Sequence, residues 1–96
     1  IPKRDWSSDV CSSDFNKVVP DKKLQDEAFA WAKAVADGPR VAIAAMKDNL
    51  DDALSVDYAT ALDREAERMV RCQRTEDHRE AVRAFVEKRK PAFLGR

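Results

Sequence analysis

Apolar residues recur with helical spacing along most of the chain from residue 21 onward. The last such stretch carries one stripe at positions i, i+4, i+7 and i+8, made of His78, Val82, Phe85 and Val86. Thr75 is a suitable N-cap for this helix because its hydroxyl can accept a free backbone N–H, and Pro91 blocks continuation. The pattern therefore predicts a final helix over about residues 75–90, whose last turn is basic at 88–90.

An amphipathic stripe also predicts a first helix, from an N-cap at Asp21 to about Asp37. Its apolar positions are Leu24, Ala28, Trp31, Ala32 and Val35. Gly38 follows, and we expect it to adopt the left-handed conformation that ends many helices. Pro39 then suits the first turn of the next helix, where its missing N–H is not needed.

Two further helices are predicted between Pro39 and the last one. The second covers about residues 39–54, and its acidic residues, Asp52 among them, are expected to face solvent. The third begins at Ser55 as its N-cap and runs to a boundary near Thr75. Neither Gly nor Pro marks that boundary, so the third and fourth helices could run on with a kink.

The N-terminal stretch has a different character from the helical region. Residues 1–15 show no helical or strand period, and Ser-Ser-Asp occurs twice, at 7–9 and 12–14. Because this run resembles translated sequencing-adapter read-through, we expect a non-native or disordered leader. Phe15–Val19 is a short strand candidate ended by Pro20. The first residue is Ile1 rather than Met, from which we expect a piece of a longer protein.

The chain is therefore predicted to be all-α, with about four helices and one short N-terminal strand-like stretch. Its apolar residues are few and rich in alanine, so we expect a layer that covers something larger. Lys and Arg total 18, as do Asp and Glu, which gives no net charge to attract nucleic acid or a membrane surface. Cys11 and Cys72 lack metal-ligand spacing, so we predict no metal site and a reduced, cytoplasmic location.

Few residues invite a catalytic interpretation. His78 lacks an orienting partner and a nucleophile, and Cys72 is more simply a half-buried thiol, so no catalytic residue is predicted. Phe85 and Lys88 differ, because residues at i and i+3 share a helix face and can meet one ligand that has a planar base and a phosphate. Arg89 can join them. The alternative is that Phe85 belongs to a core and the cations only complement the helix dipole.

Three segments resemble the C-terminal part of the enoyl-CoA hydratase/isomerase (crotonase) superfamily. They are NKVVP at 16–20, DGPRVAIAAMK at 37–47 and the ending TEDHREAVRAFVEKRKPAFLGR at 75–96. The likeness covers residues 16–96, and FVEKRKPAF at 85–93 is its most specific piece. The resemblance implies the C-terminal helical region of a crotonase-like α/β spiral fold, in a protein that forms trimers or hexamers.

The resemblance also implies an activity and its limits. Hydration of 2-enoyl-CoA in fatty acid metabolism is the expected reaction of the parent, with Phe85 against the adenine of CoA and Lys88 at a CoA phosphate. CoA enters as part of the substrate, and no tightly bound cofactor is expected. The family's oxyanion hole and catalytic glutamates belong to the spiral core, so this polypeptide alone is predicted to be inactive. The alternative is an autonomous helical module for self-association or interaction, without catalysis.

Overall fold

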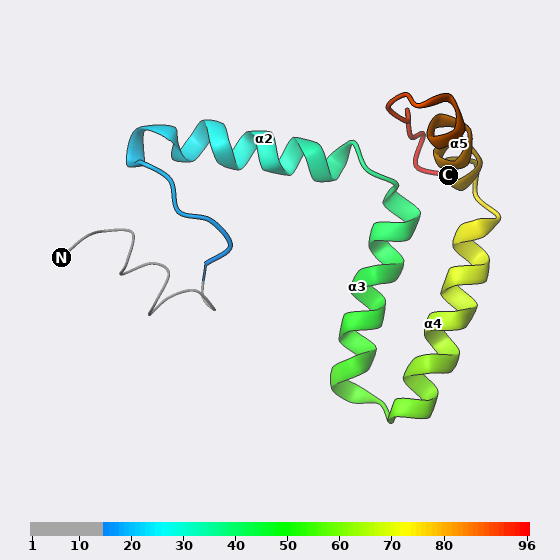
Figure 1. The fold of residues 1–96 in the computed structure, drawn as a ribbon. Helices are drawn as coiled ribbons and strands as arrows, with labels where there is room; N and C mark the ends of the chain where they lie inside the picture. Colours follow the sequence, from blue (N-terminus) through cyan, green and yellow to red (C-terminus); the bar gives the residue numbers. More distant parts are fainter. Residues whose placement is uncertain (1–14) are drawn as a thin grey trace. The chain divides into compact units, whose positions relative to one another are not determined.

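A computed structural model describes residues 15–96, so the leader predicted at residues 1–15 lies outside the described part except for Phe15. The described chain contains a short 3-10 helix, η1 (Asp21–Lys23), followed by four α-helices. These are α2 (Leu24–Ala36), α3 (Arg40–Ser55), α4 (Tyr58–Gln73) and α5 (Glu76–Glu87), shown in Figure 1. The chain divides after Lys33 into two compact units, which are described separately. The all-α prediction is confirmed for residues 15–96.

The predicted strand at Phe15–Val19 is not formed. These residues are irregular, and residues 15–96 contain no strand with which they could pair. A strand is stabilised by the hydrogen bonds of a ladder, so an isolated segment of strand-forming residues does not become one. Lys17 in this segment instead forms an ion pair with Glu27 of α2, with an Nζ–Oε2 distance of 2.6 Å.

The beginning of the first helix differs from the prediction. Asp21 is not an N-cap but the first residue of η1, and Pro20 precedes it without a side-chain cap. The backbone N–H of Lys23 donates to the carbonyl of Pro20 at 2.8 Å, which closes the 3-10 turn. A tight first turn of this kind satisfies one of the N–H groups that a side-chain cap would otherwise take.

Gly38 ends α2 for a different reason from the one predicted. It does not have a positive φ, whereas Gly95 does. A Cβ at Gly38 would lie 2.9 Å from Cδ1 of Ile43 and 3.1 Å from the carbonyl oxygen of Val35, so glycine is needed for close packing. Pro39 is the N-cap of α3, one position before the predicted one, and accepts a hydrogen bond from Ile43 N–H at 3.0 Å.

Helices α3 and α4 form an antiparallel hairpin, seen side by side in Figure 1. Asp52 of α3 lies between them and does not face solvent as predicted. It accepts hydrogen bonds from Arg68 at 2.6 Å and from Arg64 at 2.8 Å, and Arg68 also donates to Asn49 at 2.8 Å. The Arg68 guanidinium lowers the pKa of Asp52, with a smaller contribution from Arg64. One carboxylate thus fixes the register of the hairpin.

The turn between α3 and α4 uses Asp57 rather than Ser55 as the cap. Asp57 Oδ1 accepts the backbone N–H of Thr60 at 2.8 Å, and Oδ2 accepts the Thr60 hydroxyl at 2.9 Å. Ser55 is the last residue of α3, and its hydroxyl donates back to the carbonyl of Asp51 at 3.1 Å. Serine and aspartate can both cap a helix, and Ser55 and Asp57 are only two residues apart in the sequence.

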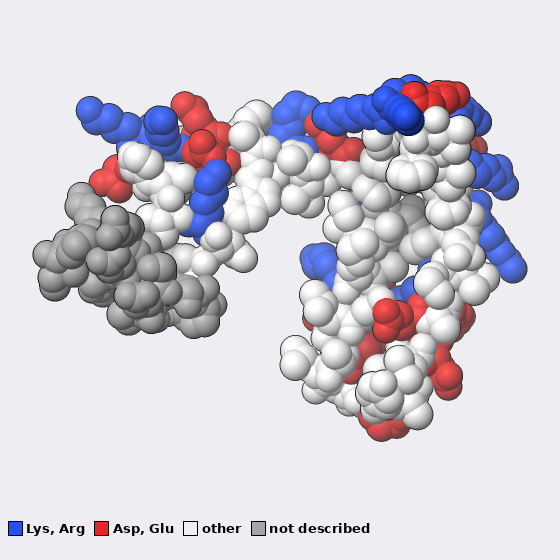
Figure 2. All heavy atoms as spheres, viewed as in Figure 1, with Lys and Arg blue, Asp and Glu red and all other residues white. Residues whose placement is uncertain are grey.

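Large apolar side chains of the described chain lie mostly on the surface. Only Ala84 and Asp77 are buried among residues 15–96. The exposed apolar residues of the hairpin are Met46, Leu50, Leu54, Tyr58, Leu62, Met69 and Val70. Figure 2 shows that uncharged residues cover most of the visible face of this hairpin. The apolar stripes predicted from the sequence are therefore present on these helices, but the described chain does not enclose them.

Candidate functional site

Helix α5 begins as predicted and ends earlier than predicted. The Thr75 hydroxyl accepts the backbone N–H of His78 at 3.1 Å, so Thr75 is the N-cap. The helix ends at Glu87, and Lys88 follows in the left-handed conformation with φ 54° and ψ 43°. Two hydrogen bonds close this end, from Lys88 N–H to the Phe85 carbonyl and from Arg89 N–H to the Ala84 carbonyl.

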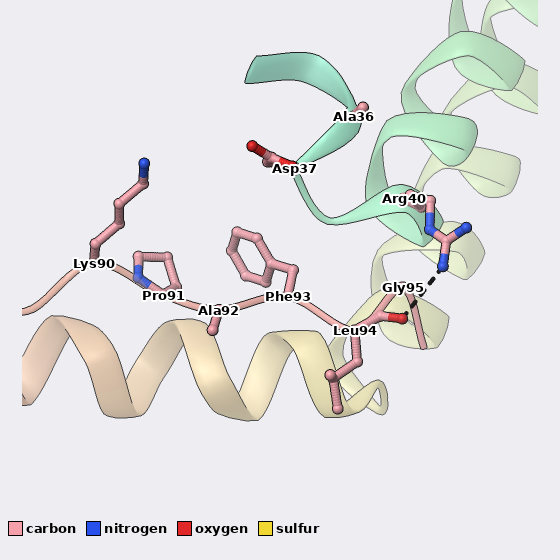
Figure 3. Close-up of a pocket in the computed structure, with 10 residues that line it drawn as sticks. Ala36, Asp37, Arg40, Lys90, Pro91, Ala92, Phe93, Leu94 and Gly95 are labelled. Atoms are coloured by element: carbon pink, nitrogen blue, oxygen red, sulfur yellow. Dashed lines mark hydrogen bonds between the residues drawn. The ribbon is translucent and has the colours of Figure 1, made fainter. Parts of the chain in front are cut away.

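The prediction that residues 88–90 form the last helical turn is therefore wrong. The helix stops before Pro91 can act, because the chain reverses direction at Lys88. Residues 89–96, here called the C-terminal strap, then run back along α5 (Figure 3). A helix dipole argument accounts for cations near a C-terminus, but it does not foresee a reversal of the chain.

Asp77 holds the far end of the C-terminal strap. Its carboxylate accepts the backbone N–H groups of Leu94 at 2.6 Å and Gly95 at 2.9 Å. Its own backbone N–H donates to the carbonyl of Arg96 at 2.8 Å. Asp77 is only 2% exposed, so these bonds satisfy a carboxylate that is largely removed from water.

Glu80 holds the strap closer to the turn. Its carboxylate accepts hydrogen bonds from Nη1 and Nη2 of Arg89 at 2.6 and 3.1 Å, and from the backbone N–H of Ala92 at 3.1 Å. The Arg89 guanidinium and the Ala92 amide together lower the pKa of Glu80 to about 2. The same contact, with a further one from Glu87, raises the pKa of Arg89.

Helix α5 has two different faces, one in contact with the strap and one turned away from it. The face toward the strap carries acidic and small residues, with Asp77, Glu80 and Ala84 at i, i+3 and i+7. The outer stripe consists of His78, Val82, Phe85 and Val86, all of them exposed. The apolar stripe predicted from the sequence is thus the outer face of α5. The face that contacts the strap is acidic, so the apolar pattern does not reveal it.

A hollow of about 490 Å³ lies where the strap passes the turn between α2 and α3. Figure 3 shows the ring of Phe93 directed into it and the guanidinium of Arg40 beside the end of the strap. Arg40 Nη2 donates to the carbonyl of Leu94 at 3.3 Å. Gly95 has φ 81°, and a Cβ there would collide with the Arg40 guanidinium, so glycine is required for this contact.

The predicted CoA-binding pair lies at the turn that ends α5. The Phe85 side chain is 85% exposed, so the alternative of a core phenylalanine is not met within the described chain. Lys88 is exposed as well and lies just past the end of α5, where its backbone N–H donates to the Phe85 carbonyl. Arg89 does not join them, because its guanidinium is held by Glu80 and Glu87.

The remaining sequence candidates gain no catalytic partners. His78 is exposed and Cys72 is a half-buried free thiol. Residues 15–96 contain no group of three His, Cys, Asp or Glu side chains that could hold a metal ion. No helix in that part of the chain is both long and apolar enough to cross a lipid bilayer.

Sequence reasoning missed the two strap-holding carboxylates, Asp77 and Glu80. An acid in the first turn of a helix, such as Asp77, is ordinarily explained by the positive end of the helix dipole, and Glu80 has the pattern of a solvent-facing acid. A signal did exist: the two acids are spaced i, i+3 on the side of α5 opposite the apolar stripe. The two acids acquire binding partners only because the chain reverses at Lys88 and brings the strap alongside them.

Acid should release the strap at Glu80. The pKa of this carboxyl is lowered from an ordinary 4.5 to about 2, so its stabilising effect is complete above pH 4.5 and is lost as the pH falls through about 2. We therefore expect the Ala92 amide to keep its protection factor from pH 7 to pH 5, and to lose it as the pH falls from the ordinary pKa of 4.5 through the lowered pKa of about 2. Carbon-13 NMR titration measures the pKa of Glu80, and amide hydrogen exchange measures the protection factor of Ala92. Titration of Glu80 near 4.5 would contradict the ion pair.

Comparisons with known proteins give a consistent result. The family model for enoyl-CoA hydratase/isomerase matches residues 15–96. The chain is 36% identical over 75 residues to a short-chain-enoyl-CoA hydratase of Clostridium acetobutylicum, covering 78% of this chain and 29% of that protein. It is 34% identical over 80 residues to the 1,2-epoxyphenylacetyl-CoA isomerase of Escherichia coli, covering 83% of this chain and 30% of that protein.

A solved structure supports the same assignment. The crystal structure of a probable enoyl-CoA hydratase/isomerase from Mycobacterium abscessus matches with a TM-score of 0.75 and 28% identity, over 85% of this chain and 32% of that one. The chain thus spans about a third of the length of these relatives. Its four helices correspond to the helical C-terminal part of the crotonase fold. The chain therefore belongs to the enoyl-CoA hydratase/isomerase family.

Proposed function

We propose that this chain contributes the outer CoA-binding surface and subunit contacts of an acyl-CoA-processing protein whose reaction is the hydration of 2-enoyl-CoA. The observation that carries the proposal is that Phe85 and Lys88 are both exposed at the turn that ends α5, where the Lys88 N–H donates to the Phe85 carbonyl, in a chain that matches the family over residues 15–96. A relative that matches this chain is named a short-chain-enoyl-CoA hydratase, which favours hydration among the family's reactions.

In this proposal Phe85 and Lys88 have separate roles. Phe85 packs against the adenine of CoA, since an exposed aromatic ring offers a planar apolar surface for a base. Lys88 contacts a CoA phosphate as a flexible point charge. The phosphate contact should weaken with added salt, because exposed charges are screened over about 10 Å at 0.1 M ionic strength.

The exposed apolar residues of α3 and α4 are proposed to pack in the larger assembly, against the spiral core or a second subunit of a trimer or hexamer. A hydratase also needs an oxyanion hole and acid–base carboxylates, and this chain is proposed to supply neither. Purified chain mixed with crotonyl-CoA is therefore expected to give no hydration above the rate without protein. Hydration that depends on protein concentration would overturn this part of the proposal.

Replacing Lys88 with alanine should weaken CoA binding by about fivefold, which corresponds to roughly 1 kcal/mol for one solvent-exposed charge contact. NMR titration of the 96-residue chain with CoA measures the dissociation constant. Phe85→Ala should weaken binding as well, through loss of the aromatic surface. The matched control is Lys90→Ala, which removes the same charge two residues away and should leave the affinity within about twofold.

Two outcomes would contradict this assignment. One is equal weakening by Lys88→Ala and Lys90→Ala, which would indicate a general effect of positive charge. The other is an affinity that does not change between low and high salt in the unmodified chain, because a lysine–phosphate contact at the surface is screened.

The second candidate function is a helical module that self-associates without catalysis. The observation that favours it is the exposed apolar surface of the α3–α4 hairpin and of α5. Thermal unfolding with and without CoA distinguishes the two functions. A cooperative transition that rises with protein concentration and ignores CoA supports the module, whereas a transition temperature that rises with added CoA supports the CoA-binding proposal.

A further inference from the structure

Lys88 adopts a backbone conformation that lysine does not favour. Within residues 15–96 it is the only residue other than glycine with a positive φ. The left-handed region brings Cβ too close to the following carbonyl oxygen, so glycine usually occupies this position at the end of a helix. Something besides the preference of the residue itself must hold the turn.

Two backbone hydrogen bonds close the turn, and the Glu80 carboxylate adds a constraint on the strap that follows it. Glu80 binds the guanidinium of Arg89, the residue directly after Lys88, and also the backbone N–H of Ala92. These two anchors lie on either side of Lys90 and Pro91, so Glu80 fixes the direction of the chain as it leaves the turn. The Glu80 side chain is 18% exposed, which leaves its contacts little competition from water.

Neither neighbouring carboxylate can replace Glu80 in this role. Glu87 reaches Nε of the same Arg89 at 2.5 Å, but it is 50% exposed and binds no backbone N–H of the strap. Asp77 binds backbone groups only at the far end, at Leu94 and Gly95. Among the three carboxylates, Glu80 is the one that binds both the Arg89 guanidinium and a backbone N–H of the strap close to the turn.

We propose that Glu80 is a positioning residue for Lys88: by tying Arg89 and Ala92 to α5, it holds the left-handed turn that sets the direction in which Lys88 leaves the helix. Its consequence for CoA rests on the function proposed above. The turn itself does not depend on CoA, so the two can be tested separately.

The experiment compares Glu80→Gln with Glu87→Gln in the 96-residue chain. Both remove one negative charge that touches Arg89, but only Glu80→Gln weakens the hold on the strap backbone. We expect the Ala92 amide to exchange about tenfold faster in Glu80→Gln and within about twofold of the unmodified rate in Glu87→Gln. The strong NOE between the amide and Hα protons of Lys88, a signature of positive φ, should fade only in Glu80→Gln.

Two further variants make the result decisive. Glu80→Asp keeps the charge but shortens the side chain, so it should behave like Glu80→Gln if reach to the strap matters and like the unmodified chain if charge alone matters. Arg89→Gln breaks the same contact from the strap side and should reproduce the change at Lys88. An unchanged Lys88 NOE and Ala92 exchange rate in Glu80→Gln, with helical circular dichroism retained, would overturn the proposal.

A CoA titration then separates this inference from the proposed function. Glu80→Gln should weaken CoA binding in the unmodified background and add no further loss in Lys88→Ala, since it acts through that lysine. Equal losses in both backgrounds would overturn action through Lys88. If the unmodified chain does not bind CoA at all, the proposed function fails, whereas the exchange rate and the NOE still decide the role of Glu80.

Discussion

Replacing Asp77 with alanine should free the end of the C-terminal strap and lower the free energy of its local opening by roughly 2 kcal/mol. The carboxylate accepts two backbone N–H groups, those of Leu94 and Gly95, and is only 2% exposed. Alanine leaves both donors without an acceptor, and the strap must detach to hydrate them. Amide exchange at Leu94 and Gly95 measures the change, which corresponds to about thirtyfold faster exchange.

The neighbouring carboxylate provides the matched control for Asp77. Glu76 pairs with Arg96 at 2.8 Å, but both side chains are exposed, and such surface pairs contribute about 0–1 kcal/mol. Glu76→Ala should therefore change exchange at Leu94 and Gly95 by less than about fivefold. If Glu76→Ala and Asp77→Ala have the same effect, negative charge at the start of α5 holds the strap, and the specific acceptor role of Asp77 is wrong.

Local signals explain how much of the fold could be predicted. Thr75 was recognised as a cap because its hydroxyl and its own helix are adjacent in the chain, and the structure confirms it. The prediction of Ser55 as a cap is wrong, because serine and aspartate both cap helices and only the folded turn shows that Asp57 Oδ1 meets the free N–H. Element existence followed from periodicity, whereas element ends depended on contacts a few residues away.

Contacts distant in sequence explain what could not be predicted. Asp52 looks like a solvent-facing acid on its own helix, yet it binds Arg64 and Arg68 because the hairpin brings α4 alongside α3. Glu80 likewise finds its partners only after the chain reverses at Lys88. Helical spacing identifies which residues share a face, but it does not say which face meets another segment.

In the candidate site, too, local spacing could be predicted from the sequence, whereas contacts between distant residues could not. Phe85 and Lys88 were selected by their spacing and by family resemblance, and their roles toward CoA stay a prediction. The two residues do not share a face of one continuous helix as predicted, since Lys88 lies just past the end of α5 in the left-handed conformation. The strap, and with it the dependence of this pair on Glu80, could not be read from spacing at all.

Ala84 offers a test of whether the end of α5 is packed as closely as its burial indicates. Ala84→Leu should destabilise the α5–strap unit by roughly 1–3 kcal/mol, because extra methyl groups in a filled site force neighbouring groups apart. Ala84 is 1% exposed, and its carbonyl accepts the N–H of Arg89 in the turn that reverses the chain. Displacement of this segment should therefore also weaken the Lys88 NOE. Amide exchange within α5 and the strap measures the loss.

The control for Ala84 is the same substitution at an exposed alanine. Ala66 of α4 is exposed, so Ala66→Leu should change exchange of its own helix by no more than about 0.5 kcal/mol. Leucine and alanine both favour helices, so neither variant should alter helix content through propensity alone. If Ala84→Leu left both the exchange rates and the Lys88 NOE unchanged, the strap would not be tightly packed on α5. The turn at Lys88 would then have to be held by hydrogen bonds alone.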